Sequence, residues 1–273
     1  MKISYQGVEG CYSYIVCNRL FPNCSYISCD TFTDAFDRVI HNEVDYAVIP
    51  IENSNAGRVT DVHSILKNTS LHIIEEYYLR IEHMLIGNKG TTMNDIKEVI
   101  SHPQALAQCS LFIQANQFKA IVGEDTAKSC VIVKEGKEKT KAAIASELAA
   151  KVYDMEIVKR NIENDSTNTT RFVVFTKNEK ECYYDEKEKD KYITSMRIEI
   201  KTINDFGEVM KKIKDNNMNV RKIEIYNKDF MINKMYIEVN AHKRDERFTK
   251  MMNDINNNTK EIFIFGSYRN IKA

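Results

Sequence analysis

Short apolar runs alternate with helix-like apolar stripes over most of the chain. ISYQG at 3–7 is typical of a strand that ends in a glycine turn, and DYAVIPI at 45–51 is typical of a buried strand. A helix is predicted over 33–42, and its apolar face contains Ala35, Phe36, Val39 and Ile40. This alternation predicts an α/β fold with a mostly parallel sheet.

The same scheme continues through the middle of the chain. Pro103 is placed to open a helix, because a proline in the first turn loses no hydrogen bond. The apolar stripe of that helix is formed by Ala105, Leu106, Cys109, Phe112 and Ile113. AIVGEDTAKSC at 120–130 predicts a strand, a turn and a helix beginning at Thr126, and KAAIAS at 141–146 predicts another strand and turn.

The pattern changes twice toward the C-terminus. Residues 179–191 are highly charged without apolar periodicity, which predicts a linker or an exposed crossover. From 192 to 273, alternating strands and two helical stripes follow the order β-α-β-β-α-β of a ferredoxin-like module. Its two helices would cover one face of the sheet and leave the other face for a partner or a ligand.

Composition narrows the classes of function. The chain of 273 residues has 39 Lys+Arg and 39 Asp+Glu, so it offers no basic field for nucleic acid. The start, MKISYQGVEG, lacks the apolar core of a signal peptide, and no window reaches the ~18 apolar residues of a membrane span. The seven cysteines form no CxxC pair and no cluster with zinc-ligand spacing, which favours reduced thiols in the cytoplasm and no metal.

Five stretches place small polar groups where predicted strands end or helices begin. They are GVEGCYS at 7–13, PIENSNAGRV at 50–59, SHPQALAQC at 101–109, DTA at 125–127 and NTTRFVVF at 168–175. Ligands of open α/β sheets bind at the carboxyl ends of strands. Together these stretches would make a cleft for a small anion, in which the guanidinium of Arg171 matches a carboxylate in two-point geometry.

The first two stretches differ in how strongly they point to function. GVEGCYS is a strand–helix turn in the simplest interpretation, and an anion site built from main-chain amides and Ser13 in the alternative. In PIENS, three consecutive side chains, Glu52, Asn53 and Ser54, carry donors and acceptors directly after an apolar strand. That density favours a functional site over a mere turn.

The next two stretches have equally good structural explanations. Ser101 or His102 would cap the helix that Pro103 opens, whereas His102, Gln104 or the free amides could instead contact a carboxylate. Thr126 is a plausible N-cap. Periodicity and spacing therefore predict a small anionic ligand without saying which one.

Taken in order, the motifs resemble those of the prephenate dehydratase family, whose members form phenylpyruvate on the route to phenylalanine. The motifs are GxxGxYS at 7–13, PIENSxxG at 50–57, SHPQALAQC at 101–109, TA at 126–127, AAIAS at 142–146 and NxTRF at 168–172. The C-terminal module is similar to the ACT domain that follows in this family, with GSY at 266–268 in its last strand.

The resemblance implies a two-lobed catalytic domain, built like a periplasmic binding protein, with the substrate between its lobes. The expected parts are a catalytic domain at 1–178 (first lobe 1–76 and 156–178, second lobe 77–155), a linker at 179–191 and an ACT domain at 192–273. A cytoplasmic enzyme of phenylalanine biosynthesis is expected, without a metal or organic cofactor, because the substrate supplies its own electron sink.

The resemblance also implies a role for the threonine of TRF, which is Thr170. Prephenate loses its ring hydroxyl and one carboxylate, and hydroxide is a poor leaving group that needs a proton donor. Thr170 is expected to donate there, in a relay with Ser54 or Asn53. Glu52 is expected to be buried and orienting, or protonated.

The remaining expected site residues bind the substrate. Arg171 and the amides near Ser13 and Thr126 would hold the two carboxylates. The full binding set is Arg171, Phe172, Ser13, His102, Gln104, Thr126 and Asn168.

The C-terminal module departs from relatives that sense phenylalanine. Those relatives carry GAL and ESRP motifs, but here 204–206 reads NDF and 224–227 reads EIYN, so only Glu224 matches. Phe206 could fill the effector space itself. Weak or absent phenylalanine inhibition is therefore expected, with a shifted alignment and an unseen effector pocket as the alternative. The module would still pair subunits into a homodimer or, alternatively, a tetramer.

Other functions remain open at this point. An arogenate dehydratase would act on the amino analogue of prephenate. A prephenate decarboxylase would keep the hydroxyl, and the intact TRF argues against it. A non-catalytic binding or sensor protein of the same fold is the alternative from a different class.

Overall fold

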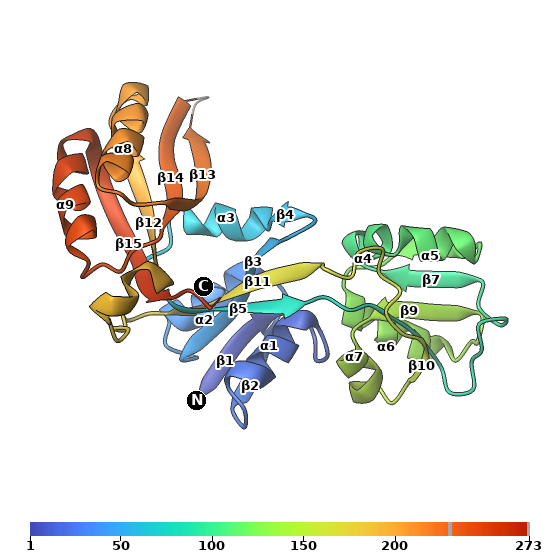
Figure 1. Ribbon diagram of the computed structural model, residues 1–273. Helices are drawn as coiled ribbons and strands as arrows, with labels where there is room; N and C mark the ends of the chain where they lie inside the picture. Colours follow the sequence, from blue (N-terminus) through green and yellow to red (C-terminus); the bar gives the residue numbers. More distant parts are fainter. Residues whose placement is uncertain (229–230, 272–273) are drawn as a thin grey trace. The chain divides into compact units, whose positions relative to one another are not determined.

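The computed structural model describes residues 1–228 and 231–271 (Figure 1). The chain forms two compact units, each assembled from segments that are far apart in the sequence. The first unit contains residues 1–35, 48–59 and 78–172, and the second contains residues 36–47, 60–77 and 173–273. The expected division into catalytic domain, linker and ACT domain stays a prediction.

The first sheet has the strand order β2-β1-β3-β11-β5, with the short strand β4 paired to β3. β1 ends in the predicted glycine turn, where Gly7 has φ +107°. β3 continues through Glu52 and Asn53, so these residues belong to the strand rather than to the turn after it. The strands are β1 (Lys2–Gln6), β2 (Ser25–Cys29), β3 (Tyr46–Asn53), β4 (Gly57–Arg58), β5 (His72–Arg80) and β11 (Thr169–Thr176). Three helices lie between them in sequence: α1 (Tyr12–Leu20), α2 (Phe32–Ile40) and α3 (Thr60–Leu66).

The second sheet is mixed, with the strand order β10-β6-β9-β7-β8. β7 runs parallel to β8 and β9, whereas β6 runs antiparallel to β9 and β10. The expectation of a mostly parallel sheet is thus too simple, because β6, the strand through which the chain enters this sheet, runs opposite to its other strands. The strands are β6 (Met84–Gly87), β7 (Glu98–Ser101), β8 (Lys119–Val122), β9 (Lys141–Ala145) and β10 (Glu156–Lys159). Its helices are α4 (Pro103–Gln108), α5 (Ser110–Ala115), α6 (Thr126–Gly136) and α7 (Glu147–Val152).

The helix predicted from Pro103 is two short helices. Cys109, with φ −113° and ψ 15°, ends α4 and begins α5. The predicted apolar stripe nevertheless faces one core, in which Ala105, Leu106, Cys109 and Ile113 are buried and Phe112 packs against them. The periodicity therefore predicted the buried face correctly and missed the break in the helix.

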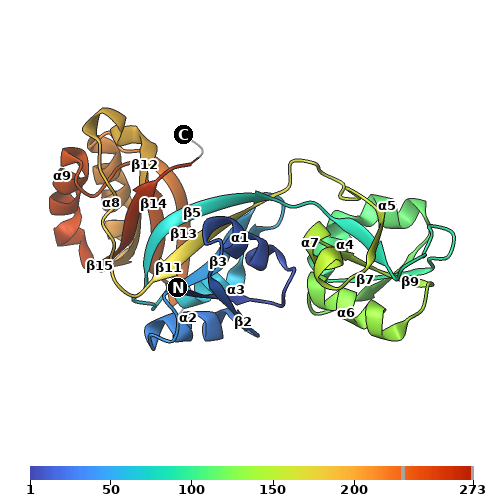
Figure 2. The same cartoon turned by 90° about the horizontal axis from the view of Figure 1, so that it is seen from below.

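The C-terminal part has the predicted β-α-β-β-α-β order. Its antiparallel sheet has the strand order β13-β14-β12-β15, and α8 and α9 lie together on one side of it (Figures 1 and 2). The elements are β12 (Tyr192–Ile200), α8 (Ile203–Asp215), β13 (Val220–Lys228), β14 (Met231–Val239), α9 (Glu246–Ile255) and β15 (Thr259–Arg269). Two short 3-10 helices, η1 (Glu186–Lys191) and η2 (Asn256–Asn258), complete the chain, and η1 lies within the predicted linker.

The opposite face of this sheet contacts α3 and the residues after it, rather than being left for a partner or ligand. Arg197 on β12 donates to the carbonyl oxygens of Leu66 (3.3 Å) and Thr69 (2.9 Å). On β13, the hydroxyl of Tyr226 lies 3.0 Å from Nδ1 of His63 on α3. These polar groups are buried but paired, as burial of polar groups requires. This packing was not predicted, because α3 was not predicted as a helix.

Among the described residues, no helix is long and apolar enough to cross a membrane.

Candidate active site

The ends of β3 and β11 are joined at the predicted site through Ser54. Its N–H donates to the carbonyl of Thr169 (2.8 Å), and the N–H of Thr169 donates to Ser54 Oγ (3.0 Å). The Ser54 hydroxyl in turn donates to Oδ1 of Asn55 (3.0 Å). This pairing brings the PIENS and NTTRF stretches into one site.

Asn53 lies at the centre of this site and is 5% exposed. Its Oδ1 accepts from the main-chain N–H groups of Asn55 (3.0 Å) and Ala56 (2.9 Å). Its Nδ2 donates to Oδ1 of Asn168 (2.8 Å) and Oγ1 of Thr170 (2.9 Å). Because main-chain N–H groups can only donate, they fix which end of the Asn53 amide carries the oxygen.

Thr170 therefore receives a hydrogen bond and keeps its own proton for another acceptor. A hydroxyl has one donor and two acceptor positions, and Asn53 occupies one of the acceptor positions. Asn168 is oriented by the same amide and is 1% exposed. Its Nδ2 has no hydrogen-bond partner among the described residues. The site thus presents two donors, one hydroxyl and one amide.

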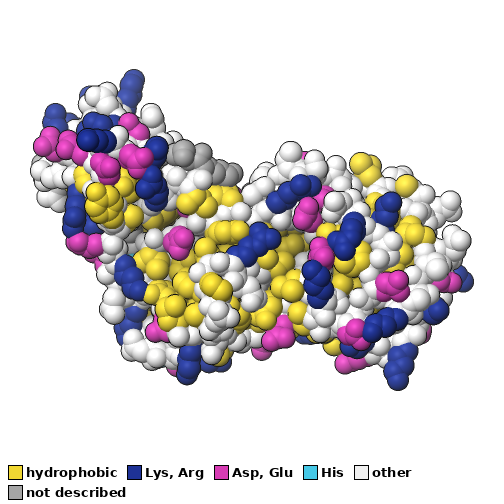
Figure 3. Space-filling view, turned by 60° about the horizontal axis from the view of Figure 1, so that its bottom comes forward, with side chains coloured by type: hydrophobic (Ala, Val, Ile, Leu, Met, Phe, Trp, Pro, Cys, Tyr) yellow, Lys and Arg dark blue, Asp and Glu magenta, His cyan; other side chains and the backbone are white. Residues whose placement is uncertain are grey.

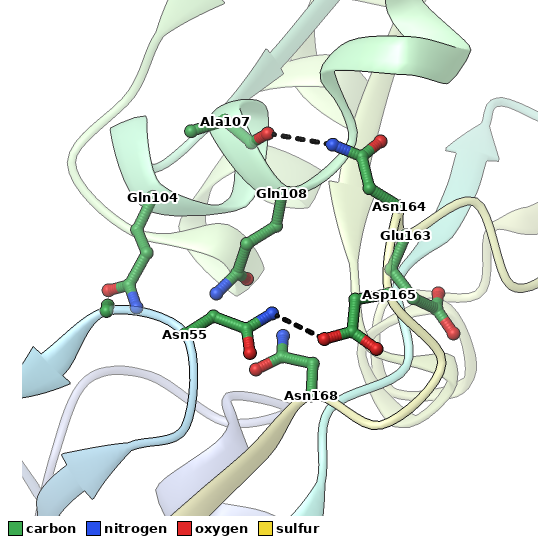
Figure 4. Close-up of a pocket in the computed structure, with 9 residues that line it drawn as sticks. Asn55, Gln104, Ala107, Gln108, Glu163, Asn164, Asp165 and Asn168 are labelled. Atoms are coloured by element: carbon green, nitrogen blue, oxygen red, sulfur yellow. Dashed lines mark hydrogen bonds between the residues drawn. The ribbon is translucent and has the colours of Figure 1, made fainter.

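A cavity of about 350 Å³ lies beside these donors. Amide side chains dominate its lining. Figure 4 shows those of Gln104 and Gln108 approaching from α4 and that of Asn168 from the residue just before β11. The lining residues are Asn55, Ala56, Gln104, Ala107, Gln108, Glu163, Asn164, Asp165 and Asn168. Of the predicted site residues, Gln104 and Asn168 line it.

His102 and Asp125 cap helices. Nδ1 of His102 accepts from the N–H of Gln104 (3.2 Å) at the start of α4, as predicted. Helix α6 is capped by Asp125, whose carboxylate accepts from the N–H of Lys128 (2.9 Å). The prediction of Thr126 as the N-cap is wrong, because Thr126 is already the first helical residue. The Asp125 carboxylate also places a negative charge at this helix start, which weakens the case for an anion there.

Helix α1 begins at Tyr12, and Cys11 caps it. The thiol of Cys11 accepts from the N–H of Tyr14 (3.5 Å), and burial raises its pKa to about 12. Ser13 lies in the first turn and is buried. The thiol therefore stays protonated at neutral pH and does not compete as an anion with a substrate.

The remaining predicted residues lie on β3 and β11. Glu52 is half-buried rather than buried, and stands opposite Arg58 in the β3–β4 pair. Arg171 is 4% exposed and Phe172 is 1% exposed. Their direct contact with substrate stays a prediction, and the burial shows that both also hold β11 in place.

Sequence reasoning missed several residues that line the cavity. They lie in END at 163–165, just before the NTTRF stretch, and at Asn55 and Gln108. Asn164 donates from its main chain to the carbonyl of Gln108 (2.7 Å), and Asn55 Nδ2 donates to Asp165 Oδ2 (3.1 Å). The run ENDSTN at 163–168 was a visible signal, because six consecutive polar residues directly before a buried strand are unusual for a simple connection.

The described residues contain no group of three or more His, Cys, Asp or Glu that could hold a metal ion. Basic and acidic side chains are interspersed over the face shown in Figure 3, which agrees with the absence of a basic field in the composition.

The fold combines two α/β sheets, a cavity lined by amides and a C-terminal ferredoxin-like module. These features define an α/β protein with an ACT-like C-terminal region. The sequence model described as "Prephenate dehydratase" matches residues 3–180, and the chain belongs to this family.

One curated relative is "Arogenate dehydratase/prephenate dehydratase 2, chloroplastic" of Arabidopsis thaliana. It is 37% identical over 177 residues, which cover 65% of this chain and 46% of that protein. The chain therefore matches less than half the length of this relative.

Two solved structures match nearly the whole chain. One is described as "GqqA- a novel type of quorum quenching acylases", with a TM-score of 0.89, 27% identity and 98% coverage of both chains. The other is the prephenate dehydratase of Arthrobacter aurescens in complex with L-Phe, with a TM-score of 0.91, 22% identity and coverage of 100% of this chain and 91% of that chain. Both matches confirm the fold, including its C-terminal part.

Proposed function

We propose that the protein is a prephenate dehydratase, which converts prephenate to phenylpyruvate, carbon dioxide and water in phenylalanine biosynthesis. The observation that carries this proposal is the orientation of Thr170. Its hydroxyl accepts from Asn53 and has its proton available at the edge of a site rich in donors. A donor at this position is what departure of a hydroxyl from prephenate requires.

In the proposed reaction, the ring C–O bond breaks as the electron pair of the carboxylate C–C bond moves into the ring. Carbon dioxide leaves, the ring becomes aromatic, and the departing hydroxide takes up a proton to become water. Thr170 supplies the hydrogen bond or proton at that oxygen and regains a proton from solvent. Since threonine is a weak acid, much of the rate would come from positioning and preorganised donors.

The two expected relay partners, Asn53 and Ser54, are held by different hydrogen bonds, and neither is placed to take up the Thr170 proton. Asn53 donates to Thr170 and so orients the hydroxyl and polarises it, but an amide in this orientation cannot accept its proton. Ser54 bonds to Thr169 and Asn55 and so holds the two strands together. We therefore assign both residues to positioning.

The same geometry favours dehydration over acyl transfer. A threonine nucleophile needs a base that accepts its proton, whereas the hydroxyl of Thr170 accepts a hydrogen bond from the Asn53 amide.

Arogenate differs from prephenate at one substituent. The ratio of the kcat/KM values for the two substrates separates these two dehydratase functions.

We also propose that phenylalanine inhibits this protein weakly or not at all. Phe206 packs against the core of the C-terminal module, in the expected effector space. Glu224 pairs with Lys222 (3.2 Å), and Tyr226, two positions further on, is buried against His63. These contacts within the chain, at the positions expected to meet an effector, support the proposal.

One experiment tests the activity and the feedback together. Purified protein is incubated with prephenate at neutral pH, and phenylpyruvate is followed by its absorbance in base, with and without phenylalanine. We expect turnover that phenylalanine leaves unchanged. Turnover suppressed by phenylalanine would overturn the feedback proposal alone, and no phenylpyruvate at all would overturn the dehydratase proposal.

A homodimer formed through the C-terminal modules is proposed as the working assembly. Strands β13 and β15 are the edges of the third sheet, and Ile225 on β13 is 38% exposed. A sedimentation experiment should give twice the chain mass of 31.7 kDa, and a monomeric mass would contradict the proposal.

A cytoplasmic location is proposed because none of the seven cysteines forms a disulfide.

A further inference from the structure

Gln108, the last residue of α4, is held at two points. Its main-chain carbonyl accepts from the N–H of Asn164 (2.7 Å). Its side-chain Oε1 lies 2.9 Å from Nε2 of His83. With the oxygen directed at His83, the amide nitrogen is on the side of the cavity that Gln108 lines (Figure 4).

His83 is 1% exposed and belongs to none of the polar stretches of the sequence. Its Nδ1 lies 2.8 Å from the hydroxyl of Tyr12, and its main-chain N–H donates to Glu163 Oε2 (2.9 Å). Burial lowers the pKa of His83, so the imidazole is neutral at neutral pH and carries one proton. The position of that proton decides which end of the Gln108 amide can face His83.

The hydroxyl of Tyr12 has one proton and two acceptors within reach, the carbonyl of Glu82 and Nδ1 of His83, and the Gln108 oxygen at Nε2 distinguishes between them. Burial raises the pKa of Tyr12 well above its usual value, so its hydroxyl stays protonated. When it donates to Nδ1, the histidine proton is on Nε2 and is donated to Oε1 of Gln108. The carbonyl of Glu82, 2.9 Å from the same hydroxyl, is the competing acceptor. The orientation of Gln108 in the structure corresponds to the first arrangement.

We propose that His83 is a positioning residue that holds the Gln108 amide nitrogen toward the cavity, where Gln108 and Asn168 together bind the side-chain carboxylate of the substrate, the one that phenylpyruvate keeps. The Asn168 amide supports this, because its Nδ2 is buried without a partner among the described residues and its Oδ1 is fixed by Asn53. Two neutral amides supply donors without a charge that would have to be desolvated. That the carboxylate belongs to prephenate rests on the proposed function.

The two acidic residues of the lining have partners of their own. Glu163 accepts from the N–H of His83 and lies 3.9 Å from a guanidinium nitrogen of Arg80. Asp165 accepts from Thr167 and Asn55, and the hydrogen bonds from Thr167 lower its pKa. The amide nitrogens of Gln104, Gln108 and Asn168 are therefore the lining amides that remain to face an anion.

A double-mutant cycle tests the proposal through binding of phenylpyruvate, measured by calorimetry on the full-length protein. His83→Leu and Gln108→Ala are each expected to weaken binding about tenfold, the size of one hydrogen bond to a charged group. The double variant should bind no more weakly than Gln108→Ala alone, because His83 acts through Gln108. Losses that multiply in the double variant, or full binding by His83→Leu, would overturn the proposal.

Three further variants test whether a loss of binding arises from the contact between His83 and Gln108. His63→Leu removes another buried histidine, which lies on α3 against the C-terminal sheet, and should leave phenylpyruvate binding unchanged. His83→Gln keeps a donor for Oε1 and should recover part of the binding. If His83→Leu fails to fold, Gln108→Glu decides: it keeps an acceptor for His83 but loses the N–H groups, so retained binding would contradict the proposal. Turnover of prephenate by the wild-type protein is measured in parallel, so that a failure of the proposed function is recognised separately.

Discussion

Replacement of Thr170 by alanine should lower kcat with prephenate by roughly 100-fold or more, the lower end of what a positioned proton donor contributes. The hydroxyl that would assist the leaving group is removed, whereas the amides around it remain. The variant also leaves one N–H of Asn53 with only the long contact to the carbonyl of Thr169 (3.4 Å) in a buried site, which should cost about 1 kcal/mol of stability. Steady-state formation of phenylpyruvate measures the first effect, and urea unfolding measures the second.

Two substitutions separate chemistry from packing. Thr170→Ser restores a hydroxyl in the same place and should recover most of kcat. Thr169→Ala removes the adjacent hydroxyl, which donates to the carbonyl of Thr167 (2.9 Å), and should change kcat only a few-fold. If Thr170→Ala kept most of the wild-type kcat, or Thr169→Ala were equally damaging, Thr170 would not be the proton donor.

Replacement of Gly266 by alanine should destabilise the fold by ~3 kcal/mol, the upper part of the range for overpacking. A Cβ at this position would lie 2.0 Å from the carbonyl oxygen of Ile73. The obstacle is main chain at the start of β5, where Ile73 is buried, so no side chain can rotate away. The strands must separate instead, and the midpoint of urea unfolding should fall accordingly.

Gly207→Ala is the matched control within the same module. Gly207 lies inside α8, and a Cβ there meets nothing within 4 Å. Alanine should therefore stabilise the helix by about 0.5–1 kcal/mol, because glycine loses more conformational freedom on folding. Equal midpoints for the two variants would show that β15 can shift at Gly266, so that its close approach to the carbonyl of Ile73 does not require glycine.

The sequence was most informative where chemistry needs particular side chains in consecutive positions. Asn53, Asn168 and Thr170 were selected as site residues, and the structure joins them by hydrogen bonds. Which of these side chains donates and which accepts could not be predicted, because main-chain N–H groups of the β3–β4 turn set the orientation of the Asn53 amide. The positions of those N–H groups depend on the backbone conformation of the turn, which the sequence alone does not specify.

The misses have equally specific causes. Asp125 and Thr126 are both good cap residues, and only the backbone decides which of them is the first helical residue. His83 follows a glutamate outside any motif, and its role depends on two contacts distant in sequence, with Tyr12 and Gln108. Helix α3 was not predicted, so the C-terminal sheet was expected to have an open face. Local patterns locate elements and clusters, whereas contacts between distant segments decide what each residue does.

The packing of α3 against the C-terminal sheet limits how this protein could be recombined with its relatives. A chimera that received an ACT domain with GAL and ESRP motifs would lose Arg197 and Tyr226 unless the graft carried them. The carbonyls of Leu66 and Thr69 and the imidazole of His63 would then lose their buried partners. A graft made to introduce inhibition by phenylalanine would therefore have to exchange α3 and the residues after it together with the C-terminal module.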